Sequence, residues 1–207
     1  MFYNEKREAC LRFGDVVTGF LSTIPVIDAP SLMSHPPYRL EVTPQCFSVI
    51  VSPCCSIRDR VLCLAPLQKI CPAFFENPYF VEDFSRINRK MPAEKTVPAA
   101  VWEKLTPEQK AKRFASTTEG YAFTDFFVYE RHPSLPEYTL NKKGGPVPTG
   151  YYMIDFKMMC RVNCDLIRSP QDSPIDAKVL ELSIEARADL RNKIVAFFAR
   201  NPDEKRL

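Results

Sequence analysis

Two short apolar runs between Val49 and Leu67 constrain the fold of this chain most strongly. The first ends in Val-Ile-Val at 49–51 and the second reads Val-Leu-Cys-Leu-Ala-Pro-Leu at 61–67, with a short polar turn between them. Runs that are this short, rich in β-branched residues and separated by turn residues are typical of paired strands. We therefore expect strands over 38–52 and 60–67 that close a β-hairpin.

The turn of this hairpin is the first candidate binding site. It carries a thiol, a carboxylate and two guanidinium groups, from Cys55, Asp59, Arg58 and Arg60. Arginines beside a thiol favour its thiolate form, and arginines also pair with phosphates. The alternative is a structural turn with a buried or capping thiol.

Further strands are expected at 121–130, at 137–140 and at 150–164. The last of these alternates at period two, which is the pattern of a half-buried strand. Asp155 falls on its outward side. The side that faces the core then carries Ile154, Phe156, Met158, Cys160 and Val162.

The sequence pattern over residues 72–118 predicts a helical insertion between the two groups of strands. Its clearest signal is Thr106-Pro-Glu-Gln109. Threonine at the N-cap, proline at the first helical position and glutamine three residues after the cap form a capping box.

The insertion is also basic, with eight lysines and arginines between Ser85 and Ser116 against three glutamates. A cationic surface with aromatic rings is typical of nucleic-acid contacts. The alternative is a solvated helical face over an aromatic core. The candidate contact residues here are Trp102, Lys110, Lys112 and Arg113.

A C-terminal helix is predicted over 182–200, with Ser183 as its cap. Apolar residues recur along it at three- and four-residue steps, which is the pattern of an amphipathic helix that packs on a sheet. The apolar face carries Ala186, Leu190, Ile194 and Phe197, and the outer face carries Glu185, Asp189, Lys193 and Arg200.

Together these elements predict an α+β fold. We expect a small, mostly antiparallel β-barrel or curled sheet of the SH3-like kind, with the insertion and the C-terminal helix added to it. The length of 207 residues and the 45% hydrophobic content allow a sizeable core. We therefore expect a single domain over 1–207.

The eight cysteines are expected to be reduced thiols, because the sequence starts without a signal peptide and holds no apolar run of about 18 residues. A cytoplasmic protein without membrane contact follows. Only Cys160 and Cys164 have a spacing that resembles a zinc-ligand pair. The sequence also lacks the glycine-rich phosphate-binding and hydrolase motifs. We expect no metal and no cofactor.

Part of the chain resembles the MazF/PemK type of SH3-like barrel. The resemblance covers about the first 70 residues and lies in Gly-Asp-Val-Val at 14–17, Val-Ile-Val at 49–51 and the run at 61–67. It implies paired core strands in a small barrel and a ribonuclease or RNA-binding activity. Phe47-Ser48 stand where that family has Arg-Pro, which argues against ribonuclease activity.

The chain also resembles uncharacterised small bacterial proteins that pair a Ser-x-x-Cys-Asp strand end with a C-terminal helix. The matching residues are Ser52 to Cys55, with Ser56 in place of the acidic residue, then Leu182-Ser183, Arg187, Leu190, Phe197-Phe198 and Arg200. Such proteins resemble accessory parts of mobile-element or antiviral-defence modules.

The function expected from the sequence is that of a non-enzymatic accessory or interaction subunit in a bacterial cytoplasmic assembly, with protein partners. This function is favoured by the absence of recognisable catalytic motifs, by the 12% content of aromatic residues and by proline-stiffened loops that suit contact surfaces. One alternative is a MazF-like nucleic-acid binder or endoribonuclease. Another is a thiol enzyme that depends on Cys55, although the two histidines, His35 and His132, both lie in proline-containing loops.

Overall fold

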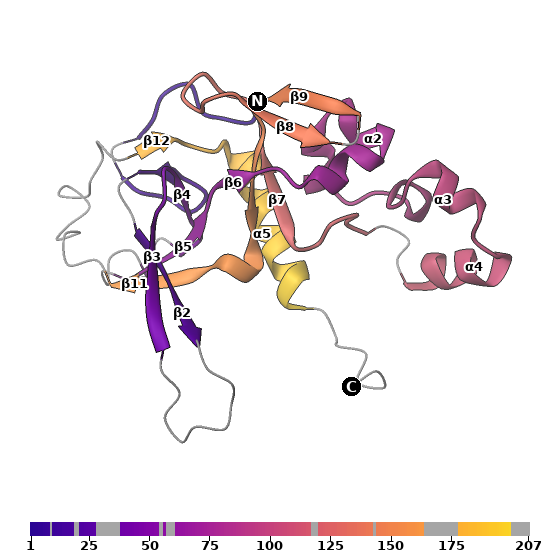
Figure 1. Cartoon of the computed structure of the whole chain (residues 1–207), viewed down its shortest axis with the longest axis horizontal. Helices are drawn as coiled ribbons and strands as arrows, with labels where there is room; N and C mark the ends of the chain where they lie inside the picture. The colour runs from indigo at the N-terminus through magenta and orange to yellow at the C-terminus, as the bar shows by residue number, and fades with distance from the viewer. Residues whose placement is uncertain are drawn as a thin grey trace. The chain divides into compact units, whose positions relative to one another are not determined.

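The computed structural model describes residues 1–8, 10–18, 21–27, 38–53, 56, 61–116, 120–142, 144–163 and 178–199 (Figure 1). Over these residues, four α-helices accompany several antiparallel sheets, which confirms the predicted α+β class. Within the same ranges, no helix is both long and apolar enough to cross a membrane.

The chain divides into two compact units. Unit 1 comprises Met1–Glu5, Gln68–Met158 and Leu182–Leu207, and unit 2 comprises Lys6–Leu67 and Met159–Glu181. Neither unit is a continuous segment, so the grouping does not separate one independent domain from the rest. The single domain over 1–207 stays a prediction.

Unit 2 contains an antiparallel sheet of five strands in the order β11-β5-β4-β1-β12. A small core of Leu11, Val17, Ile50, Leu62 and Leu64 supports it, and Cys160 and Val162 pack against that core. In the described part of the chain these strands do not close on themselves, and the SH3-like barrel is not confirmed. The strands are β1 (Val16–Val17), β4 (Ser48–Ile50), β5 (Val61–Pro66), β11 (Cys160–Asn163) and β12 (Lys178–Leu180).

The hairpin predicted from the two apolar runs is present. Strands β4 and β5 pair antiparallel, with Val49 opposite Ala65. The expected strand over 38–52 is nevertheless two strands, because β3 (Tyr38–Pro44) pairs instead with β2 (Leu21–Ile27). Proline cannot donate a ladder hydrogen bond, and the first of the two strands ends at Pro44.

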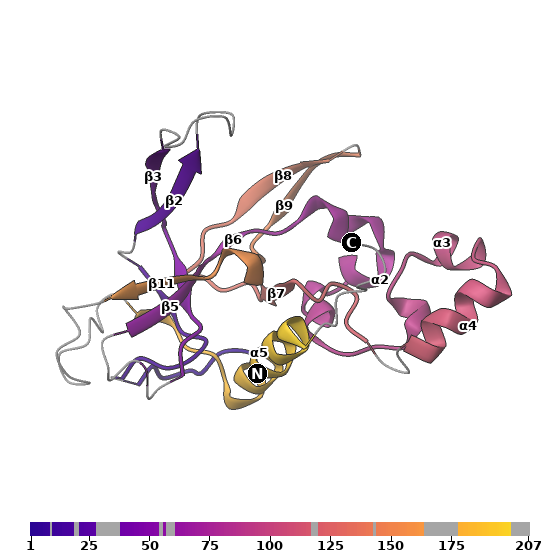
Figure 2. The ribbon, with the colours of Figure 1, turned by 90° about the horizontal axis from the view of Figure 1, so that it is seen from below.

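Unit 1 contains the sheet β6-β10-β7, formed by Gln68–Lys69, Tyr152–Asp155 and Phe126–Tyr129. A separate hairpin joins β8 (Tyr138–Lys142) to β9 (Gly145–Thr149), and the two strands run side by side in Figure 2. Gly145 has φ +103°, a conformation that side-chain-bearing residues rarely adopt. The strand expected at 137–140 corresponds to β8. The strand expected at 121–130 is shorter than predicted, because residues 121–125 form a bend and a turn before β7.

The strand expected over 150–164 is wrong as one continuous element. Strand β10 ends at Asp155, whose carboxylate accepts a hydrogen bond from the Lys157 amide at 2.9 Å. This local bond competes with the strand ladder, and the 3₁₀ helix η4 (Phe156–Met158) follows. Phe156 is buried as predicted, but Met158 is exposed rather than in the core.

The predicted helical insertion at 72–118 consists of short elements around an aromatic core. Buried Ile70, Phe74, Phe80, Phe84 and Ile87 belong to this core. Helices α3 and α4 lie next to each other in both views (Figures 1 and 2). The elements are η1 (Pro72–Glu76), α2 (Pro78–Val81), η2 (Phe84–Asn88), η3 (Ala93–Lys95), α3 (Ala99–Glu103) and α4 (Pro107–Ser116).

Asn88 fixes the end of η2 to the sheet of unit 1. Its side-chain amide donates to the Val128 carbonyl at 2.6 Å, and its side-chain oxygen accepts from the Val128 amide at 2.7 Å. All of these groups are buried, where an unpaired backbone group would be costly. The Asn88 side chain thus pairs with both backbone groups of Val128 in β7, as a neighbouring strand would.

The C-terminal helix α5 spans Ile184–Phe198, and the Ser183 side chain accepts from the Ala186 amide at its N-terminus. Ala186 and Leu190 are buried, in agreement with the predicted apolar face. The assignment of Lys193 to the outer face is wrong, because its side chain is fully buried. The long aliphatic stem of lysine suits an apolar environment, and the ammonium reaches a buried carbonyl, that of Ile87.

Candidate functional site

The candidate residues of the β4–β5 turn have no described geometry. Cys55, Arg58, Asp59 and Arg60 all lie outside the described residues. The structure therefore neither brings these groups together nor separates them. Their role stays a prediction.

The candidate residues of the insertion are partly brought together. The Lys110 ammonium lies 5.7 Å from the centroid of the Trp102 ring, so one face of the indole is engaged within the chain. Lys112 is exposed on α4. Arg113 belongs to α4, but its side chain is outside the described part. The predicted capping box is confirmed, because Thr106 and Gln109 exchange bonds of 3.0 and 3.2 Å.

A cavity of about 600 Å³ lies beside α5 in unit 1, and we refer to it as the α5 cavity. One side comes from the end of η2, another from Tyr121 and the rest from α5. It is lined by Asn88, Arg89, Lys90, Tyr121, Asp189, Arg191, Asn192, Val195 and Ala196. Its volume is in the range of cavities that hold small ligands.

The charge of the α5 cavity is positive. Arg89, Lys90 and Arg191 are exposed, and none of them forms a salt bridge with another described residue. Asp189 is the sole carboxylate among the lining residues. In the sequence, Arg89 and Lys90 are noted only as part of the basic run of the insertion. That they line a cavity together with α5 is a tertiary feature, which no local pattern predicts.

Lys193 lies next to this cavity, where it contacts the lining residue Tyr121. Its ammonium is 5.3 Å from the centroid of the Tyr121 ring and donates to the Ile87 carbonyl. Burial lowers the pKa of Lys193 well below its usual value, and the Asp125 charge acts in the opposite direction. Burial also raises the pKa of Tyr121, with a smaller contribution from Asp189.

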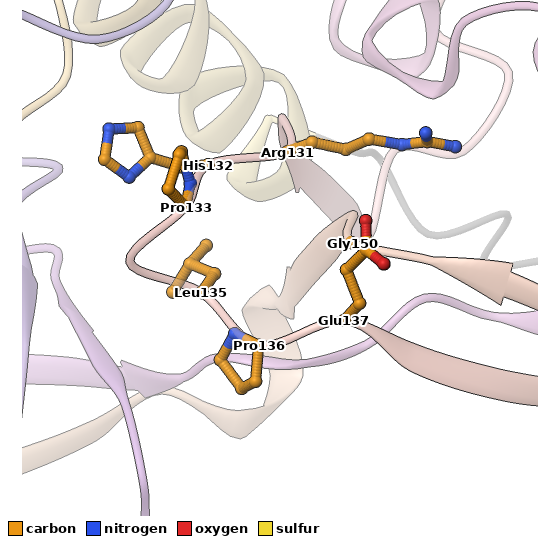
Figure 3. A pocket seen from close by; sticks show the side chains of 7 residues that line it. All are labelled: Arg131, His132, Pro133, Leu135, Pro136, Glu137 and Gly150. Atoms are coloured by element: carbon orange, nitrogen blue, oxygen red, sulfur yellow. The ribbon is translucent and has the colours of Figure 1, made fainter.

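A second cavity in unit 1, of about 420 Å³, is shown in Figure 3. The Arg131 side chain extends away from His132 and places its guanidinium 5.1 Å from the Tyr151 ring centroid. His132 accepts from the Ser134 amide at 3.1 Å. Both side chains thus have structural roles. The lining residues are Arg131, His132, Pro133, Leu135, Pro136, Glu137 and Gly150, and none of these is a serine, cysteine or lysine nucleophile.

Unit 2 holds a buried charge cluster. The Lys178 ammonium lies 2.8 Å from a carboxylate oxygen of Asp15 and 2.6 Å from one of Glu181. Burial raises the pKa of Asp15 to about 6, although Lys178 favours its charged form. The cluster is sealed from solvent, so it offers no access to a substrate.

The five described free cysteines are Cys10, Cys46, Cys63, Cys71 and Cys160. Burial raises the pKa of both Cys63 and Cys160, which disfavours the nucleophilic thiolate. Within the described ranges, no group of three or more potential ligands is placed to hold a metal ion.

Three exposed apolar side chains lie along one side of α5. Ile184, Val195 and Phe198 are 75%, 61% and 68% exposed, and they recur at the spacing of one helix side together with Arg191. This face was missed in the sequence, because the periodic signal of Leu190 and its neighbours dominated the assignment of the helix. We refer to these three apolar residues as the outer α5 face.

Comparisons with protein-family models, with curated proteins and with solved structures find no match to this chain. The fold defines its class as an α+β protein built on antiparallel sheets. Any functional conclusion must come from its own residues.

Proposed function

We propose that this chain is a non-enzymatic interaction subunit of a cytoplasmic bacterial assembly, of the accessory type found in antiviral-defence or mobile-element modules. The outer α5 face is its contact surface for a protein partner. The supporting observation is the exposure of Ile184, Val195 and Phe198 on one side of a single helix. Single exposed apolar residues are ordinary, but several on one face favour an interface.

The helix that carries this face is held rigidly. Ser183 caps its N-terminus, and Ala186 and Leu190 are buried on its inner side. Phe197 packs against Phe156 with ring centroids 5.5 Å apart. A rigid helix loses little conformational entropy when a partner binds, which favours affinity. Burial of the exposed side chains would contribute about 25 cal/mol for each Å² of apolar surface.

An SH3-like relationship of unit 2 belongs to the same proposal. It is supported by the antiparallel order β11-β5-β4-β1-β12 and by the β4–β5 hairpin. SH3-like folds commonly present protein-contact surfaces, in line with an accessory role.

The test is a paired set of surface variants in co-purification with the products of neighbouring genes. Val195→Asp combined with Phe198→Asp is expected to abolish recovery of the partner, because two carboxylates would be desolvated in the contact. Val101→Asp is the matched control, since Val101 is 45% exposed on α3 and lies outside the outer α5 face. Equal recovery with all three proteins would contradict the proposal. Circular dichroism establishes that the variants are folded.

A second candidate function is the binding of single-stranded nucleic acid by the basic insertion. It is supported by the exposed Lys104 and Lys112 and the half-buried Lys110 around α3 and α4. Binding to RNA at about 50 mM salt should weaken as salt is raised. Loss of two lysines in Lys110→Ala/Lys112→Ala should reduce that salt dependence. The absence of binding at low salt would rule this function out.

A further inference from the structure

We propose that the α5 cavity binds a small phosphate-bearing molecule, with Arg89, Lys90 and Arg191 as the groups that hold the phosphate. This inference goes beyond the interaction function, because it requires no protein partner. It rests on the placement of three cations from two separate segments around one cavity.

The first supporting feature is the rigidity of the backbone that carries Arg89. The residue before it, Asn88, is bonded twice to Val128 at 2.6 and 2.7 Å. The residue before that is Ile87, whose carbonyl oxygen accepts a hydrogen bond from the Lys193 ammonium. Lys193 belongs to α5, so this contact ties the helix to the same segment. A ligand site built on fixed elements loses little free energy to ordering when it is filled.

The second feature is the net positive charge of the lining, although Arg89 also interacts electrostatically with Glu130 outside it. Arg89, Lys90 and Arg191 make no salt bridge with a described residue, and Asp189 alone opposes them within the lining. Cations gathered in a concave surface attract anions. Two of the three are arginines, whose planar donor groups match the oxygens of a phosphate. A dianionic phosphate therefore compensates this site better than a single carboxylate.

The third feature is the remainder of the cavity. Val195 and Ala196 supply apolar surface, Tyr121 supplies an aromatic ring and Asn192 supplies an amide. A volume of about 600 Å³ is much larger than a phosphate ion needs. The favoured ligand therefore carries an organic group about the size of a sugar or a nucleoside beside its phosphate.

The test is titration calorimetry of the full chain with inorganic phosphate, ribose 5-phosphate, glycerol 3-phosphate, adenosine monophosphate and adenosine. At least one organic phosphate is expected to bind more tightly than inorganic phosphate, and adenosine is expected not to bind. Arg89→Gln/Arg191→Gln should weaken that binding at least about tenfold, because each arginine supplies charge-assisted hydrogen bonds. Glycerol 3-phosphate represents a lipid headgroup. Ribose 5-phosphate and adenosine monophosphate represent a nucleotide.

The control variant is Lys6→Gln/Arg161→Gln, which removes two exposed positive charges from unit 2, outside the cavity. It should bind the same probe with unchanged affinity. The proposal would be overturned by no binding of any phosphate probe at millimolar concentration, or by equal weakening in both variants. It would also be overturned if a ten-nucleotide RNA bound tenfold more tightly than every small probe and lost that affinity in Arg89→Gln/Arg191→Gln, since the cavity would then serve a nucleic-acid backbone. Unchanged thermal unfolding of the glutamine variants excludes loss of fold as the cause of weaker binding.

Discussion

Lys178 and Asp15 form a buried ion pair, with 2.8 Å between the ammonium and a carboxylate oxygen and almost no exposure of either side chain. Glu181 shares the same ammonium at 2.6 Å, so two carboxylates surround one cation. The second oxygen of Asp15 has no hydrogen-bond partner among the described residues. These three side chains connect the start of β1 to β12, and their titration should be visible in the stability of the fold.

The first prediction concerns the pH dependence that Asp15 confers. Its pKa is raised from 3.8 to about 6 in the folded state. The folded protein therefore binds more protons than the unfolded chain between these two pH values. The stabilisation that comes from the protonated Asp15 side chain is fully present below pH 3.8 and is lost as the pH rises through about 6. The free energy of unfolding of wild type minus that of Asp15→Asn should fall over this range, by an amount on the order of 3 kcal/mol. Urea unfolding at several pH values measures it, and a flat difference would contradict the assignment.

The second prediction concerns Lys193. Burial lowers its folded-state pKa, so the unfolded chain binds more protons between that pKa and 10.5. The stability of wild type relative to Lys193→Met should therefore rise as pH increases from neutral toward 10. Lys90→Met, which removes an exposed ammonium at the α5 cavity, controls for the loss of a cation. Chemical denaturation across this pH range provides the measurement, and a relative stability that stayed flat or fell with pH would show that the folded-state pKa of Lys193 is not lowered.

The third prediction concerns Asn88. Removal of its side chain in Asn88→Ala leaves the Val128 amide and carbonyl buried without their partners. We expect a loss of about 2–4 kcal/mol in the free energy of unfolding. Asn192→Ala removes an exposed asparagine from α5 and should change stability by less than about 0.5 kcal/mol. Similar losses in the two variants would mean that the Asn88 bonds are not made in solution.

The fourth prediction concerns the capping box of α4. Thr106→Ala removes the acceptor for the Gln109 amide and should destabilise the helix by about 1 kcal/mol. Thr106→Ser keeps the hydroxyl and should retain most of that stability. Hydrogen exchange of the first-turn amides of α4 is the suitable readout, because an exposed helix can unfold locally. Equal protection in the alanine and serine variants would be inconsistent with a functional cap.

The elements that sequence reasoning predicted well have local signals. The β4–β5 hairpin follows from two apolar runs, and Thr106 and Ser183 mark the starts of α4 and α5 through their side-chain chemistry. Each signal acts within a few residues, which is the range that a sequence pattern reports.

The errors arose where tertiary contacts decide the outcome. Lys193 has the polarity of a surface residue, but the carbonyl and the ring that receive its ammonium come from Ile87 and Tyr121, far away in the chain. The strand expected through Phe156 fails because Asp155 bonds locally to the next turn. The α5 cavity likewise depends on two segments about 100 residues apart, so its cations could be noted in the sequence but not assembled.

The most direct measurement of the central proposal is the native mass of the chain co-expressed with the products of its neighbouring genes, by size exclusion with light scattering. We predict a defined complex that contains this chain and that is lost in Val195→Asp/Phe198→Asp. A mass equal to that of the 23.7 kDa monomer in every co-expression would contradict the proposal that the outer α5 face binds a partner.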